Sequence, residues 1–333
     1  MNHSISFFRI IFTIIIAFWH FPMLSWMPSG YIVVEFFFIL SGFLLYQSSY
    51  KNIGVILYAK KRISKFWFKA VAITTILSLT DSSILNNSIN ELLQYFVNIY
   101  MLLYDIIPLE YDITISNGVY WYLTTLIWGS VLIYAIIKTF PQKHKFILAI
   151  LCFACYAIVL TNGIGVNKAS WEYPLPLLRA LGGLSLGCIL NCIVNEHCNI
   201  LNNKLLNIIS FLGIIISTVL LFIIGSHGIL PAVCYFFIIF ACFKKESIIY
   251  NILNYPIFSK GASICFEIFI GHFLVTKVVL KILQLCLDAD IIQGINTIEK
   301  IIGSIIYIIS LCIFGYIYHK VCNKIEEKLN PFI

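Results

Sequence analysis

The sequence predicts an all-α fold, a polytopic transmembrane helical bundle of about ten spans with both termini in the cytoplasm. Of the 333 residues, 60% are hydrophobic and 11% are charged, and the mean hydropathy is +0.94. Soluble domains of this length do not have such a composition. Apolar runs of roughly 18 to 25 residues recur along the chain, and each can cross the hydrocarbon core as a helix. They leave no stretch for a separate soluble domain, so residues 1–333 are expected to form a single integral-membrane domain.

The placement of Lys and Arg gives the predicted orientation. With the N-terminus in the cytoplasm, most Lys and Arg residues fall in cytoplasmic loops, as the positive-inside rule requires. These loops explain the net charge of +7, so the expected partner is the lipid bilayer and not nucleic acid. The predicted spans are 7–25, 30–48, 66–80, 119–138, 146–162, 174–194, 205–225, 229–243, 262–287 and 299–321.

Residues 81–118 are expected to remain outside the membrane as an amphipathic or re-entrant segment, although 92–104 is apolar. A full crossing there would place Lys138, Lys143 and Lys145 outside and would invert the next three spans.

The first two spans carry charges where a simple anchor would have leucine, namely Arg9, His20 and Glu35. A charge in the hydrocarbon core costs roughly 2.5 to 10 kcal/mol, so three of them indicate a functional site. Arg9 and His20 are separated by ten residues, which returns them to within about 20° of one helix face and about 16 Å apart along the axis. One face of the first helix is therefore expected to carry both.

Depth in the membrane separates these residues. His20 is expected about one and a half turns from the outer end of the first span, and Glu35 a similar distance into the second, so the two can meet. Arg179 is expected at the same outer depth of the sixth span, where Gly182, Gly183 and Gly187 allow close helix approach. Arg9 lies near the cytoplasmic end.

The basic stretch KKRISKFWFK at 60–69 has two interpretations. It can be a solvated face that touches anionic lipid. Alternatively it binds a phosphate-rich ligand from the cytosol, with Phe66 and Trp67 beside a nucleotide ring.

Cys152 and Cys155 have CxxC spacing, but they lie in an apolar run without a second pair or a His at ligand spacing. We interpret them as small buried hydrophobic residues and expect no metal site.

These patterns resemble the acyltransferase 3 family of membrane-bound O-acyltransferases, which modify sugars of bacterial surface polysaccharides. Arg9-x10-His20 is similar to the arginine and histidine of the family's first span. Residues 30–43, GYIVVEFFFILSGF, are similar to its glycine, acidic residue, paired phenylalanines and Ser-Gly-Phe. Arg62-Ile-Ser-Lys65 resembles its R-x-x-R stretch, with Lys65 in place of the second arginine and without the usual proline. The resemblance covers essentially the whole chain and extends to Trp121-Tyr122-Leu123 and to residues 263–273, which include Glu267 and His272.

The resemblance implies a stand-alone acetyl-CoA-dependent O-acyltransferase in the bacterial inner membrane, without the soluble esterase-like domain that some members carry. Its co-substrate would be a cytosolic acyl-CoA, commonly acetyl-CoA, and its acceptor a hydroxyl of a cell-surface polysaccharide or lipid-linked glycan.

We expect Lys61, Arg62 and Lys65 to hold the coenzyme A phosphates, with the pantetheine arm running past Arg9 toward His20. His20 would be a general base or a transient acyl carrier, and Glu35 would orient its imidazole. Candidates for oxyanion stabilisation, acceptor contact or a structural role are Arg179, Trp121, Tyr122, Glu267 and His272.

Structural roles remain open for several of these residues. Glu35 and Arg179 can form a buried structural ion pair, His272 can be a hydrogen-bonded core histidine, and Glu267 can pair with a loop lysine. The alternative functions are a polysaccharide or lipid-linked sugar transporter and a glycan polymerase. A transporter should show internal repeats, and no clear repeat is present. A polymerase should have a large external loop, whereas 81–118 is modest and mainly acidic.

Overall fold

The computed structural model describes residues 2–23, 27–49, 53–104, 106, 116–162, 174–195, 202–225, 228–287 and 297–329. Regular structure in these residues is helical, with no strand, so the predicted all-α fold is confirmed. The elements are α1 His3–Trp19, η1 Gly30–Val33, α2 Val34–Ser49, α3 Val55–Leu79, α4 Ser82–Leu85, α5 Ile89–Tyr100, α6 Tyr120–Thr139, α7 His144–Asn162, α8 Leu175–Asn195, α9 Asn203–Leu221, α10 Leu230–Phe243, α11 Ile248–Leu253, α12 Ile257–Ala262, α13 Cys265–Leu287 and α14 Thr297–Leu329.

Seven helices of the described chain are long and apolar enough to cross a membrane: η1 with α2, α6, α7, α8, α9, α13 and α14. Two further apolar helices are shorter, α1 with 17 residues and α10 with 14. At about 1.5 Å per residue, α10 covers about 21 Å, which is less than the hydrocarbon core. The predicted total of ten spans and the cytoplasmic position of both termini therefore stay predictions.

The boundaries of several predicted spans differ from the helices, and the differences at α1 and α3 concern the predicted site residues. The first span was expected at 7–25, but α1 begins at His3, where the Asn2 side chain accepts a hydrogen bond from the amide of Ile5, and it ends at Trp19. His20 is therefore the C-cap of α1 and does not lie inside the helix. The third span was expected from residue 66, but α3 already begins at Val55, because Lys and Arg are good helix formers and do not interrupt it.

Helices α2 and α8 pack against each other more closely than any residue larger than glycine would allow. A Cβ atom on Gly42 would lie 2.0 Å from the carbonyl oxygen of Leu184, and one on Gly187 would lie 1.9 Å from that of Ile39. Both contacts are with backbone atoms, which cannot move aside. The expected close approach at Gly187 is confirmed, and it brings Glu35 of α2 beside Arg179 of α8.

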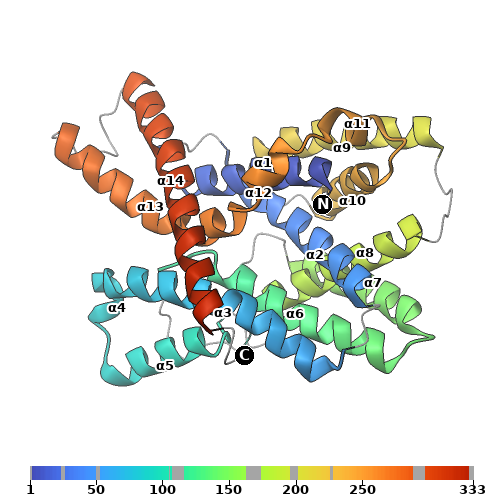
Figure 1. Ribbon diagram of the computed structural model, residues 1–333, viewed down its shortest axis with the longest axis horizontal. Helices are drawn as coiled ribbons and strands as arrows, with labels where there is room; N and C mark the ends of the chain where they lie inside the picture. The colour runs from blue at the N-terminus through green and yellow to red at the C-terminus, as the bar shows by residue number, and fades with distance from the viewer. Residues whose placement is uncertain are drawn as a thin grey trace.

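The segment after α3 folds back along that helix. In α5, the Tyr95 hydroxyl lies 2.7 Å from that of Ser78, and the carbonyl of Tyr100 accepts a 2.8 Å hydrogen bond from the Trp67 indole. Because higher numbers in α5 meet lower numbers in α3, the two helices are antiparallel, as Figure 1 also shows.

The chain reverses direction at Leu102, whose φ of 56° is left-handed. The carbonyl of Leu102 accepts a 2.8 Å hydrogen bond from the indole of Trp128, and that of Tyr104 accepts a 2.7 Å bond from Thr124. Trp128 lies eight residues, about 12 Å, along α6 from Tyr120, whereas Thr124 lies only four residues along it. The chain thus runs along α6 as far as Trp128 and then turns back toward Tyr120. The amphipathic or re-entrant placement of 81–118 outside the membrane stays a prediction.

Helix α14, with 33 residues, crosses the other helices steeply and packs on α13 (Figure 1). Its Tyr318 hydroxyl donates a 2.8 Å hydrogen bond to the carbonyl of Lys69 in α3. The C-terminal half of α14 therefore lies beside the basic residues of α3.

Candidate active site

Two histidines from distant parts of the chain meet at the end of α1. The Nε2 atom of His272 in α13 lies 3.2 Å from the Nδ1 atom of His20. His272 is completely buried, and the ring of Phe273 packs against both imidazoles at centroid distances of 4.6 and 4.7 Å. Any side chain on Gly118 would collide with Phe273, since a Cβ atom would lie 2.8 Å from its ring.

Backbone carbonyls fix the tautomers of the histidine pair. His272 Nδ1 lies 2.7 Å from the carbonyl oxygen of Phe269, which can only accept, so this nitrogen carries the proton. In the neutral ring, His272 Nε2 is then an acceptor. His20 Nδ1 also lies 3.0 Å from the carbonyl of Ile16 and must be protonated to bind both acceptors. The remaining nitrogen of His20, Nε2, therefore has a free lone pair, which a general base or a nucleophile requires.

His20 lines a cavity of about 40 Å³ at the junction of α1, η1, α6 and α13. This volume holds about two or three water molecules. The walls are mostly aromatic, and the residues that line it are Ile16, Trp19, His20, Tyr31, Val34, Gly118, Val119, Trp121, Tyr122 and Phe269. The cavity brings the predicted site residues Trp121 and Tyr122 together with His20.

Glu35 does not contact His20 and is part of a different buried group. It forms an ion pair with Arg179 through Oε1 and accepts a 3.0 Å hydrogen bond from Tyr156 through Oε2. The side chains of Glu35 and Arg179 are 2% and 1% exposed. The predicted contact between Glu35 and His20 is therefore wrong, and His272 is the ring that orients His20.

Arg179 connects this ion pair to the cavity wall. Its guanidinium donates a 3.2 Å hydrogen bond to the carbonyl of Tyr31 and lies 5.6 Å from the ring centroid of Trp121. Both residues line the cavity, so the ion pair acts on the site by holding its walls. This geometry matches the buried structural ion pair of Glu35 and Arg179, which the sequence left open.

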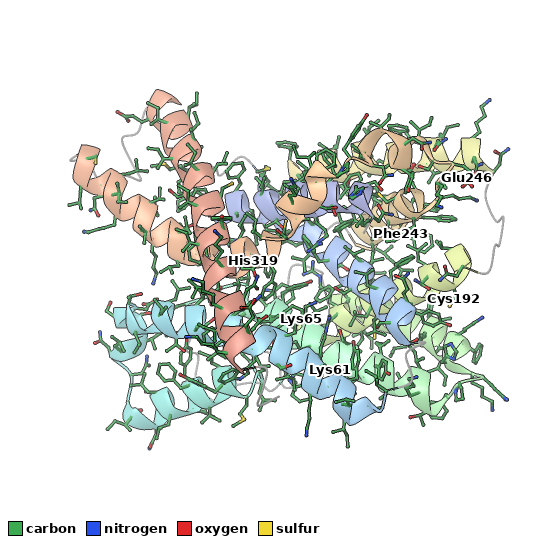
Figure 2. All side chains as sticks on the ribbon, viewed as in Figure 1. Lys61, Lys65, Cys192, Phe243, Glu246 and His319 are labelled. Atoms are coloured by element: carbon green, nitrogen blue, oxygen red, sulfur yellow. The ribbon has the colours of Figure 1, made fainter. Side chains whose placement is uncertain are left out.

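Cationic side chains gather about the N-terminal halves of α1 and α3. The charges of Arg62, Arg9 and Lys69 all act on Lys65. Arg62 donates a 3.2 Å hydrogen bond to Ser130, but its Nε is buried without a partner. Within the described chain, Arg9 and Lys65 form no hydrogen bond or ion pair. Lys61 lies on the exposed side of α3, one turn from Lys65 (Figure 2).

Glu267 pairs with a helical lysine and not with the expected loop lysine. Lys69 of α3 lies 3.0 Å from Glu267 Oε1 and 3.4 Å from Glu326. His319 of α14, labelled in Figure 2, also lies 3.0 Å from Glu267 Oε1. These contacts lock α3, α13 and α14 together beside the cationic cluster.

Sequence reasoning missed three contributors to these contacts. Tyr156 and Tyr31 hold the Glu35–Arg179 pair, but nothing distinguishes them among the 19 tyrosines of the sequence. Lys69 was part of the basic stretch 60–69, and its position between Phe68 and Ala70, at the apolar end of that stretch, is a signal that it points into the bundle.

One comparison with known proteins gives a match. A family model described as an acyltransferase domain matches residues 2–319, from before α1 into the last third of α14. No curated protein and no solved structure matches the chain.

Proposed function

The chain belongs to the acyltransferase 3 family, and from this membership we propose that it transfers an acyl group from cytosolic acyl-CoA to a hydroxyl of a cell-surface polysaccharide or lipid-linked glycan. Family membership and the apolar helices make it an integral-membrane acyltransferase. Acetyl-CoA is the proposed co-substrate, and the bacterial cytoplasmic membrane the proposed location.

The observation that carries this proposal is the histidine pair at the aromatic cavity. His20 Nε2 takes the proton of the acceptor hydroxyl, and the hydroxyl oxygen attacks the thioester carbonyl carbon. The C–O bond forms, the C–S bond breaks, and the protonated Nε2 returns its proton to the thiolate of coenzyme A. If the acyl group rests on the enzyme in transit, the same nitrogen is the nucleophile.

The cationic cluster supports the donor side of the proposal. Arg9, Arg62 and Lys65 repel one another and form no ion pair in the described chain, and Glu326 is the carboxylate that acts on Lys65. An anion bound among them therefore relieves the remaining repulsion. The coenzyme A phosphates are such anions. Arg9 and His20 are separated by about 16 Å of helix, a length that an extended pantetheine arm covers.

The first prediction concerns His20. Purified wild-type protein in lipid vesicles is expected to release coenzyme A from acetyl-CoA when a glycan acceptor is present, and His20→Ala is expected to lose at least about a thousandfold in rate. The measurement is thiol release together with mass spectrometry of the glycan. Wild-type protein that neither binds nor turns over acyl-CoA with any glycan acceptor would eliminate the enzyme function.

The second prediction concerns the cationic cluster. Arg62→Ala combined with Lys65→Ala is expected to raise the KM for acetyl-CoA about tenfold or more and to change the saturated rate much less, because phosphate contacts act equally on ground and transition states. Lys143→Ala with Lys204→Ala, two exposed lysines away from the cluster, is the control for charge removal elsewhere. An unchanged KM in the first double variant would favour a lipid-facing role for 60–69.

A further inference from the structure

The cavity beside His20 lies on the N-terminus of α6. Gly118, Val119, Trp121 and Tyr122 all line it, and they form the first turn of that helix and the residues just before it. The amide of Tyr120 binds the carbonyl of Asn117 at 2.9 Å, whereas the amides of Trp121 and Tyr122 bind no described carbonyl that precedes the helix. A helix N-terminus with free amides favours negative charge.

The indole of Trp121 is a second unpaired donor at the same place. Three other described tryptophans donate their indole N–H to a backbone carbonyl: Trp19 to Pro28 at 3.2 Å, Trp67 to Tyr100 at 2.8 Å and Trp128 to Leu102 at 2.8 Å. Trp121 is 7% exposed, and its indole has no acceptor among the described residues. The indole nitrogen is not among the fully buried polar atoms that lack a partner, so it retains some accessible surface. Trp121 lines the cavity beside His20.

The position of this indole is fixed. The Arg179 guanidinium lies 5.6 Å from its ring centroid, and the ring of Tyr122 meets it edge-on at 6.2 Å. A donor that is already oriented and shielded from bulk water loses no reorganisation energy when negative charge develops beside it.

We propose that the Trp121 indole N–H and the free amides at the N-terminus of α6 form the oxyanion site for the acyl carbonyl. The inference rests on the proposed acyl transfer. When the acceptor oxygen adds to the thioester carbon, the electron pair of the C=O bond moves onto oxygen, and these N–H groups bind that oxyanion. When the C=O bond re-forms, the C–S bond breaks and the thiolate receives the proton from His20 Nε2.

Replacement of the indole by a ring without N–H tests the oxyanion site. Trp121→Phe keeps an aromatic ring beside Arg179 and is expected to lower kcat about a hundredfold, with the KM for acetyl-CoA changed less than about twofold. Trp128→Phe removes an indole outside the cavity and is the matched control, with near wild-type kcat expected. Thermal denaturation of both variants verifies that they are folded.

A binding measurement tests the same site without turnover. A trifluoromethyl-ketone analogue of acetyl-CoA, whose hydrated carbonyl mimics the tetrahedral intermediate, is expected to bind wild-type protein more tightly than coenzyme A does. Trp121→Phe is expected to weaken the analogue about tenfold or more and to leave coenzyme A affinity unchanged.

The outcomes separate this inference from the function on which it rests. Wild-type turnover that depends on His20, together with wild-type kcat in Trp121→Phe, would overturn the oxyanion site and leave the acyltransferase function standing. Equal weakening of the analogue and of coenzyme A would also overturn it. Failure of wild-type protein to bind or turn over acyl-CoA would overturn both the oxyanion site and the acyltransferase function.

Discussion

His272 orients the imidazole of His20, a role that the sequence assigned to Glu35. Its Nδ1 proton is held by the carbonyl of Phe269, and its Nε2 accepts from His20. A group that contacts only the base, and not the substrate, acts as a positioning residue: it selects the tautomer that leaves His20 Nε2 unprotonated.

The third prediction follows from that role. His272→Ala is expected to lower kcat about a hundredfold with little change in either KM, because substrate binding does not depend on the tautomer of His20. His272→Gln keeps an amide oxygen near the position of Nε2 and is expected to recover part of the rate. Equal losses in the two variants, or a loss confined to KM, would contradict the positioning role.

Single residues also show how far sequence reasoning reaches. His20 could be identified as a site residue because a polar group in an apolar span is costly. Its partner could not, since the sequence pointed to Glu35 at a matching depth, and only the packing of α2 on α8 directs Glu35 to Arg179 instead. That choice depends on two glycines 145 positions apart, at 42 and 187.

At the scale of the element, α4 begins at a carboxylate that ties three segments together. Asp81 is its N-cap, accepts hydrogen bonds from the amide and hydroxyl of Ser83, accepts a 2.8 Å bond from Ser116 and lies 3.4 Å from Lys277 of α13. The Ser83 hydroxyl contributes most to lowering the pKa of Asp81 to about 2, and Ser116 and Lys277 lower it further, against the opposing effect of burial.

The fourth prediction is a pH dependence. Because the folded pKa of Asp81 is below its ordinary 3.8, its stabilisation is present above about pH 4 and is lost as the pH falls through about 2. Solvent screening limits the contribution of the Asp81 charge to the free energy of unfolding to about 1 kcal/mol or less. Asp81→Asn keeps the N-cap and removes the charge. Thermal denaturation should show a wild-type advantage at pH 6 that shrinks below pH 4, whereas a pH-independent difference would contradict this account.

The segment at 92–104 shows why element boundaries were harder to predict than element types. Residues 92–104 are apolar enough for a span, and composition left amphipathic and re-entrant forms open. At the reversal, the indoles of Trp67 and Trp128 bind the carbonyls of Tyr100 and Leu102. Such contacts join residues far apart in sequence, so no local pattern contains them.

For the whole molecule, the orientation of the spans decides which compartment each site faces. The fifth prediction is that alkaline phosphatase inserted after Asn87 is active, because the predicted orientation places Asn87 outside, whereas the same insertion after Gln142 is inactive. The lysines near Gln142 favour the cytoplasm. Phosphatase activity after Gln142 would mean that residues 92–104 cross completely and that the next three spans are inverted.

The Glu35–Arg179 pair also has a consequence for the order of synthesis. Its two members are 144 residues apart in the chain, so at about 5 to 20 residues per second the ribosome makes α2 roughly 7 to 30 seconds before the partner of its carboxylate. During that interval α2 carries an unpaired acid, which would cost about 2.5 to 3.5 kcal/mol at the bilayer centre and costs less at the outer depth expected for Glu35. We therefore expect nascent α2 to stay beside the insertion machinery, or to enter lipid in its protonated form, until α8 arrives and completes the pair.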